Sequence, residues 1–260
     1  MQPFRWAIAA ALTATMATSQ AGPSTPTVVR VQPSGAQVPE NLLRISIELA
    51  APVEQPLLPR IALLRADGEL IQEPFLEQEL WSPSGKLLTV LLHPGRVKSG
   101  LKAREEKGPI LSVGDNVSLV LDGRLIKRWS VGPADTTGPV VAAWKVLPVD
   151  GVSKQSLIVK LDGPIDGRDA GHIAVSDMRN RRVSGRAQLK NNEGTWTFTP
   201  DAPWRVGEYK LVARATLEDP AGNRLGGHVE TPIDAPREAA ADTVLLFSVV
   251  PRPSVRGVTQ

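Results

Sequence analysis

The 260-residue chain contains no cysteine. This absence excludes thiol nucleophiles, zinc–thiolate centres and dithiol redox chemistry, each of which requires a cysteine sulfur. It does not argue against an exported protein, because a chain of this length can bury enough apolar surface for about two domains without disulfide bonds. The sequence therefore predicts a protein that is stabilised by its hydrophobic cores.

Histidine is also scarce. The chain has three, in separate predicted loops and without a His-x-x-x-His spacing: His93, His172 and His228. No Gly-x-Ser-x-Gly elbow, phosphate-binding loop or dinucleotide fingerprint occurs. We therefore expect no cofactor and no bound metal. Calcium remains an alternative, because loop carboxylates and amides bind it, and two groups could contribute: Asp219 with Asn223, or Asp162 with Asp166 and Asp169.

Aromatic residues make up only 4% of the chain, with a single tyrosine. A sugar-cleaving cleft generally uses aromatic platforms, so we expect no enzyme, although folding could still bring together a carboxylate pair for glycoside hydrolysis. Charge is nearly balanced, with 30 Lys and Arg against 27 Asp and Glu, and the two signs are interspersed. This pattern argues against a nucleic-acid partner, which usually requires clustered basic residues.

The N-terminus has the pattern of a secretory signal peptide. Arg5 supplies a positive charge, the stretch 6–16 is apolar, and Ser19 and Ala21 place small residues before a cleavage site. The apolar stretch is shorter than the roughly 20 residues that a membrane-spanning helix needs. We therefore predict a cleaved signal peptide at residues 1–21, export to the periplasm or the medium, and no membrane span.

Alternating apolar and polar residues predict strands. Trp196 and Phe198 would share one face of a strand, and Tyr209 and Leu211 one face of the next. Pro200 ends the first of these strands, because proline cannot donate a ladder hydrogen bond. With 22 glycines and 23 prolines to form turns, the chain is predicted to be all-β.

The motifs Thr-Phe-Thr-Pro, Pro-Trp-x-x-Gly-x-Tyr-x-Leu and Asp-Pro-Ala-Gly-Asn, within residues 140–249, resemble bacterial Ig-like domains of the SbsA type. The stretch 80–102 also resembles exported bacterial proteins with two such units. The resemblance implies small β-sandwiches in exported and surface proteins, and it implies no particular activity.

The same order of strands and turns occurs twice. Ile45, Ile47 and Leu49 precede Pro52 as Leu157, Val159 and Leu161 precede Pro164. A segment rich in Pro and Gly separates the two units. We therefore predict two tandem immunoglobulin-like β-sandwich domains at residues 22–132 and 140–250, with a short, stiff linker at 133–139 and a tail at 251–260.

The first unit has an insertion at residues 95–110 that the second lacks. Long loops lie at the surface and often carry binding residues. Its basic side chains are the candidate site for a carboxylate or phosphate: Arg96, Lys98, Lys102, Arg104 and Lys107. Arg96 is the best candidate for a bidentate contact. The alternative is that Leu101 and Ile110 close the open end of the first sandwich while the charges stay solvated.

Three functions follow in order of preference. The first is a non-catalytic exported module that binds an envelope or extracellular protein or a glycan through the insertion and the groove between the units. The second is a structural spacer or assembly subunit without a specific ligand. The third is an enzyme of unknown class. The sequence does not predict the oligomeric state.

Overall fold

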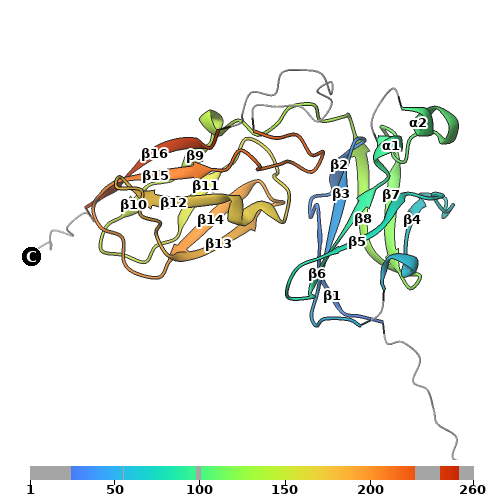
Figure 1. Cartoon of the computed structure of the whole chain (residues 1–260), viewed down its shortest axis with the longest axis horizontal. Helices are drawn as coiled ribbons and strands as arrows, with labels where there is room; N and C mark the ends of the chain where they lie inside the picture. Colours follow the sequence, from blue (N-terminus) through green and yellow to red (C-terminus); the bar gives the residue numbers. More distant parts are fainter. Residues whose placement is uncertain (1–24, 55, 98–100, 226–240, 252–260) are drawn as a thin grey trace, which may run out of the picture.

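The computed structural model describes residues 25–54, 56–97, 101–225 and 241–251 (Figure 1). The predicted signal peptide, Lys98 and His228 lie outside the described residues. So do most of the predicted tail and most of the segment that leads to the last strand.

The first unit is a sandwich of two four-stranded sheets. One sheet has, in spatial order, β1 (Val28–Gln32), β3 (Arg44–Leu49), β6 (Leu87–Leu92) and β5 (Phe75–Trp81). The other has β2 (Gln37–Pro39), β8 (Arg124–Gly132), β7 (Asn116–Leu121) and β4 (Ile61–Arg65).

The second unit repeats this order of strands. One sheet has β9 (Lys145–Val146), β11 (Leu157–Lys160), β14 (Thr195–Pro200) and β13 (Gly185–Lys190). The other has β10 (Val149–Asp150), β16 (Thr243–Val250), β15 (Gly207–Ala213) and β12 (Ile173–Asp177).

Both units have the topology of an immunoglobulin-like sandwich. The first strand switches sheets, so its second part pairs in parallel with the last strand: β2 with β8, and β10 with β16. All the other strand pairs are antiparallel. The predicted all-β fold of two tandem Ig-like sandwiches is therefore confirmed.

Each sandwich has its own hydrophobic core. Ile45, Ile47 and Leu88 are fully buried in the first, as the alternating pattern predicts. Aromatic rings dominate the second, where Trp204 contacts Phe198, Tyr209 and Phe247. The Tyr209 hydroxyl donates to the Arg205 carbonyl oxygen at 3.0 Å, a contact that resembles the tyrosine corner of Ig domains.

Helical segments are short. The insertion folds as α1 (Pro94–Val97) and α2 (Lys102–Lys107) at one end of the first sandwich (Figure 1). Single 3-10 turns are η1 (Leu58–Arg60), η2 (Val141–Ala143) and η3 (Asp169–His172). In the described ranges, no helix has the length and apolar character to cross a membrane.

Candidate functional site

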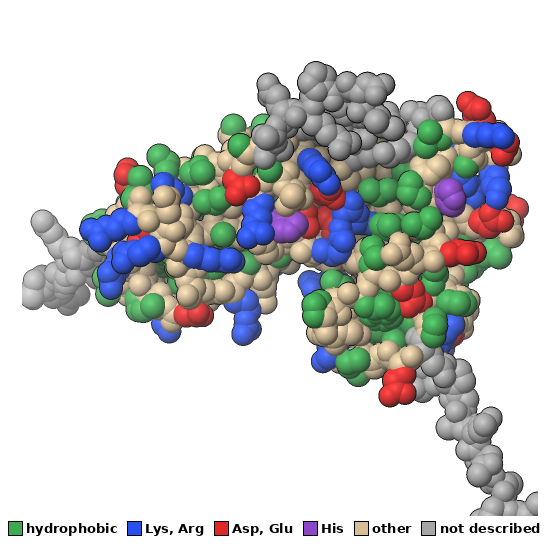
Figure 2. Space-filling model, viewed as in Figure 1, with side chains coloured by type: hydrophobic (Ala, Val, Ile, Leu, Met, Phe, Trp, Pro, Cys, Tyr) green, Lys and Arg blue, Asp and Glu red, His purple; other side chains and the backbone are tan. Residues whose placement is uncertain are grey.

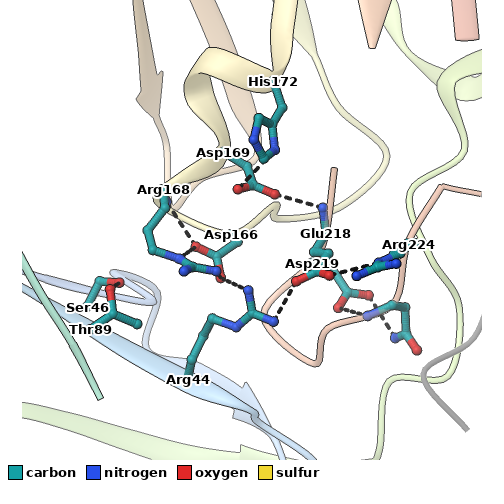
Figure 3. Close-up of polar contacts among 11 residues, drawn as sticks. Arg44, Ser46, Thr89, Asp166, Arg168, Asp169, His172, Glu218, Asp219 and Arg224 are labelled. Carbon is teal, nitrogen blue, oxygen red and sulfur yellow. Dashed lines mark hydrogen bonds and ion pairs between the residues drawn. The ribbon is translucent and has the colours of Figure 1, made fainter. Parts of the chain in front are cut away.

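The two sandwiches meet at a polar junction (Figure 3). The first contributes the end of β1 and the segment that leads into β3. The second contributes the loop from β11 to β12, the turn from β13 to β14, and the loop after β15. These loops come from distant parts of the chain, so only the completed fold assembles the junction.

Arg44 is the central residue of the junction. It is the first residue of β3, and its guanidinium crosses to two carboxylates of the second sandwich (Figure 3). Nη1 lies 3.2 Å from Asp166 Oδ2, and Nη2 lies 2.5 Å from Glu218 Oε2. All three side chains are largely buried, so water screens these ion pairs only weakly.

Each of these carboxylates also binds an arginine of its own sandwich. Asp166 accepts from Arg168 Nε at 3.0 Å, and Glu218 accepts from Arg224 Nε at 3.0 Å. Burial alone would raise the pKa of Glu218, but Arg44 and Arg224 outweigh burial and hold that pKa below its ordinary value. Glu218 is therefore a stable anion that faces Arg44 at neutral pH.

A second layer of contacts supports the loops that carry these carboxylates. Asp169 accepts from the Glu218 backbone N–H at 2.8 Å and lies 3.2 Å from His172 Nδ1. Burial raises the pKa of Asp169. The Leu43 N–H also donates to the Pro220 carbonyl oxygen at 3.0 Å, which adds a backbone bond between the sandwiches.

Glu193 forms an independent contact between the sandwiches. Its carboxylate accepts from the Ser34 backbone N–H at 2.8 Å and from Gln32 Nε2 at 3.2 Å. Glu193 ends a turn in which Asn191, Asn192 and Glu193 have φ of 51°, 55° and 61°. Three successive left-handed residues without glycine are costly, and asparagine tolerates this region best. The turn is thus specialised to present the Glu193 carboxylate to the first sandwich.

The groove between the units is nearly filled. A Cβ at Gly167 would lie 2.2 Å from the Gln32 side-chain amide, so the close approach of the two chains requires glycine there. The remaining cavity, bounded by Arg44, Asp166 and Pro220, has a volume of about 10 Å³. This volume accommodates about one water molecule.

The linker is attached to both sandwiches through Asp135. Asn41 of the first sandwich accepts from the Asp135 N–H at 2.9 Å and donates to its carbonyl oxygen at 2.7 Å. Asn223 of the second sandwich donates to the same oxygen at 2.9 Å. These hydrogen bonds attach the linker to both sandwiches, and its stiffness stays a prediction from its proline content.

Asp219 positions Asn223 for this contact. Its carboxylate accepts from the Asn223 backbone N–H at 2.9 Å and from Asn223 Nδ2 at 2.8 Å. Burial raises the pKa of Asp219 to about 6, and these hydrogen bonds offset only part of that effect. The structure therefore contains a buried carboxyl group that ionises near neutral pH.

The structure places the guanidinium of Arg96 inside the insertion. Arg96 is 5% exposed, and it donates to the carbonyl oxygens of Gln72 at 2.5 Å and Gly108 at 3.0 Å. Longer contacts reach the carbonyl oxygens of Glu73, Lys107 and Pro109. These contacts join the insertion to the loop between β4 and β5.

The other predicted site residues do not converge on one point. Arg104 Nη1 donates to the Val97 carbonyl oxygen at 2.8 Å, and it thereby connects α2 to α1. Lys102 is exposed and lies 3.6 Å from Glu106, while Lys107 pairs with Glu73. Leu101 is exposed, whereas Ile110 is buried in the first core, so only Ile110 acts as the alternative interpretation expects.

The residues suggested as calcium ligands bind other partners in the structure. Asp162 accepts from the Val140 N–H and from Trp144 Nε1, both at 2.8 Å, so it supports the start of the second sandwich. Asp166 faces arginines, as described above. Among the described residues, no group of three or more His, Asp or Glu side chains has an arrangement that could hold a metal ion.

No protein-family model and no curated protein matches the chain. Solved structures similar to it include an L,D-transpeptidase from Mycobacterium smegmatis, with 14% identity over 86% of this chain and 74% of that chain and a TM-score of 0.29. Domains 5-6 of the S-layer protein SbsC match with 11% identity over 88% of this chain and 100% of that chain, at a TM-score of 0.27.

The tandem Ig repeats of Dlar match with 12% identity over 75% of this chain and 92% of that chain, at a TM-score of 0.24. Similarities this remote say nothing about activity, and the Ig-like fold rests on the strand order described above. The finer resemblance to SbsA-type domains stays a prediction.

Replacing Arg96 tests whether it is an internal structural residue. Arg96→Met should lower the free energy of unfolding by about 2–4 kcal/mol, because several buried carbonyl oxygens lose their donor. Urea denaturation measures this change. The matched control is Lys102→Met on the exposed face of α2, which should shift stability by less than about 0.5 kcal/mol. Equal stability of the two variants would contradict the structural role of Arg96.

The raised pKa of Asp219 predicts a pH dependence of stability. In the unfolded chain this carboxyl group ionises at about pH 3.9. The protonated Asp219 therefore adds to the free energy of unfolding fully below that pH, and this contribution is lost as the pH rises through about 6. The loss amounts to about 3 kcal/mol at most. Because Asp219 makes stability fall as the pH rises between these values, urea denaturation should give a slope of stability against pH that is more positive for Asp219→Asn than for the parent. The exposed control Asp201→Asn should keep the parent's slope, and an unchanged slope in Asp219→Asn would refute the assignment.

Proposed function

We propose that this chain is a non-catalytic structural module in which two Ig-like sandwiches are locked end to end as a rigid spacer. The observation that carries this proposal is the buried ion pairing of Arg44 with Asp166 and Glu218 across the junction. Relative motion is the default where a domain interface is not large and hydrophobic, so rigidity at this junction would depend on these specific polar contacts.

Three contacts between the sandwiches support rigidity. They are centred on Arg44, on Glu193 and on the linker residue Asp135. One contact would leave the sandwiches free to rotate about it, whereas three contacts restrict that rotation. Opening the junction would break both ion pairs of Arg44 and return the three charged side chains to water. The pairs therefore favour one relative orientation of the sandwiches through their geometry more than through a large gain in stability.

The geometry favours the spacer over a module that binds in the groove. The cavity at the junction has space for about one water, and Arg96 and Arg104 donate to backbone carbonyls of the insertion and its neighbours. The carboxyl groups at the junction face arginines or amides rather than an open cleft. This arrangement supports a structural use of the charged residues.

The junction predicts a fixed distance between the sandwiches. The absence of cysteine allows spin labels to be placed at Asp67→Cys in the first sandwich and Gln188→Cys in the second, both at exposed positions. Pulsed electron spin resonance should give one narrow distance distribution for the parent. Arg44→Ala combined with Glu193→Gln should broaden it, because the first contact is then lost and the second loses its charge.

The matched control is Arg30→Ala, which removes an exposed arginine that pairs with Glu48 within the first sandwich. Its distance distribution should stay narrow. A distribution that is equally narrow in the junction variant, or already broad in the parent, would refute the rigid spacer.

We also infer that the spacer acts outside the cytoplasm, on the basis of the signal-peptide pattern at residues 1–21. Expression of the full chain in a bacterial host should yield a processed protein that begins at Gly22. Intact-mass spectrometry measures this directly. The control Ala21→Glu should block processing, because the cleavage site requires a small residue there. Recovery of only the unprocessed chain from the parent would contradict export.

A further inference from the structure

At the end of the second sandwich that faces away from the junction, hydrogen-bonded connecting segments form the surface. Three connecting segments meet there: residues 150–156, 178–184 and 201–206. They bind one another through backbone hydrogen bonds, from Asp201 N–H to the Ser184 carbonyl and from Val152 N–H to the Trp204 carbonyl. Gly151 N–H likewise donates to the Val250 carbonyl at 2.7 Å, which attaches the end of β16. This set of segments is called the distal end.

Arginines project from the hairpin between β12 and β13. Asp177 shapes this hairpin, because its carboxylate accepts from the backbone N–H groups of Arg179 and Arg181 and from Arg181 Nε. Arg179, Arg182 and Arg186 are exposed, and across the part of the chain that the structure describes their guanidinium groups form no ion pair. Figure 2 shows Lys and Arg side chains gathered at this end, on the left.

Exposed apolar side chains lie on the same end. Val152 is 84% exposed, Val206 52%, Val250 45% and Met178 44%. Val206 and Val250 lie close together, because a Cβ at Gly151 would lie 2.5 Å from Val206 Cγ2 and 3.2 Å from the Val250 carbonyl oxygen. Val152 follows Gly151 directly, so these three residues belong to one small region of the distal end.

Val152 is the least expected of these residues. Its φ is 59°, a left-handed conformation that strains a β-branched side chain and that glycine or asparagine would adopt more readily. Packing does not explain a valine that is so exposed. Backbone strain of this kind persists where the surroundings impose it, and it often marks a functional position.

We propose that the distal end binds the surface of an anionic lipid bilayer. The segments that form it, with the flanking residues 177, 185, 186, 207 and 208, carry six basic side chains against four acidic ones. An anionic bilayer attracts each nearby Lys or Arg by about 1 kcal/mol, and it also accepts exposed apolar side chains at its interface. A soluble polyanion would use the arginines and leave Val152 and Val206 in water, so the combination favours the bilayer.

This proposal does not depend on the rigid junction. The distal end belongs to the second sandwich alone, whereas the junction lies at that sandwich's other end (Figure 1). If both proposals hold, the second sandwich would rest on the membrane and the junction would set the orientation of the first. Arg44→Ala with Glu193→Gln should then alter the distances between labels without altering lipid binding, which separates the two tests.

Sedimentation of the full chain with vesicles tests the proposal. The parent should bind vesicles that contain phosphatidylglycerol and phosphatidylcholine, and it should not bind vesicles of phosphatidylcholine alone. Binding should fall at least about tenfold in Arg179→Gln/Arg182→Gln/Arg186→Gln, because three electrostatic contacts are lost. The matched control removes the same charge from the first sandwich, with Lys86→Gln/Lys102→Gln/Arg124→Gln, and should bind like the parent.

Val152→Asn distinguishes a bilayer from a soluble polyanion. This variant should keep its fold, since asparagine tolerates a positive φ. It should bind anionic vesicles several-fold more weakly than the parent and should bind inorganic polyphosphate equally well. Failure of the parent to bind anionic vesicles would overturn the proposal, as would vesicle binding that is unchanged in either the Val152 or the arginine variant.

Discussion

The buried guanidinium of Arg44 is the interaction on which the arrangement of the two sandwiches depends. It stands between Asp166 and Glu218 of the other sandwich, and each of these has a second arginine partner. A partly formed network would destabilise the fold, because a buried charge without its partner costs several kcal/mol of folding free energy. The complete network thus strongly favours one relative orientation, and the contacts of Glu193 and Asp135 are consistent with that orientation.

Arginine has two different uses in this chain. Arg44, Arg96 and Arg104 point inward, where their planar donor groups satisfy carboxylates or backbone carbonyls that water does not reach. Arg179 and Arg182 point outward from a turn that Asp177 shapes, and Arg186 points outward from β13. The first group holds loops and domains in position, and the second leaves charge available to an outside surface. Local sequence does not distinguish the two uses, because the inward Arg44 and the outward Arg186 both lie at or next to the first residue of a strand.

Strands with one buried face were predictable, because alternation with period two is a local signal. Ile45, Ile47 and Leu49 predicted β3, and Leu157 and Val159 predicted β11. The edge strand β13 and the long strand β8 were not predicted, since each exposes much of its length and alternates weakly. The junction could not be predicted either. Arg44 begins a strand, a position that many solvated arginines also occupy, and its partners lie far along the chain. The insertion at 95–110 was recognisable, but not the inward direction of Arg96.

Rotational diffusion measured by nuclear spin relaxation tests the central claim most directly. If the junction holds the two sandwiches as one body, the backbone amides of both should fit a single diffusion tensor, with the overall tumbling time of the whole chain. Two separate tensors, each with the shorter tumbling time of a single sandwich, would show that the sandwiches move independently and would contradict the account.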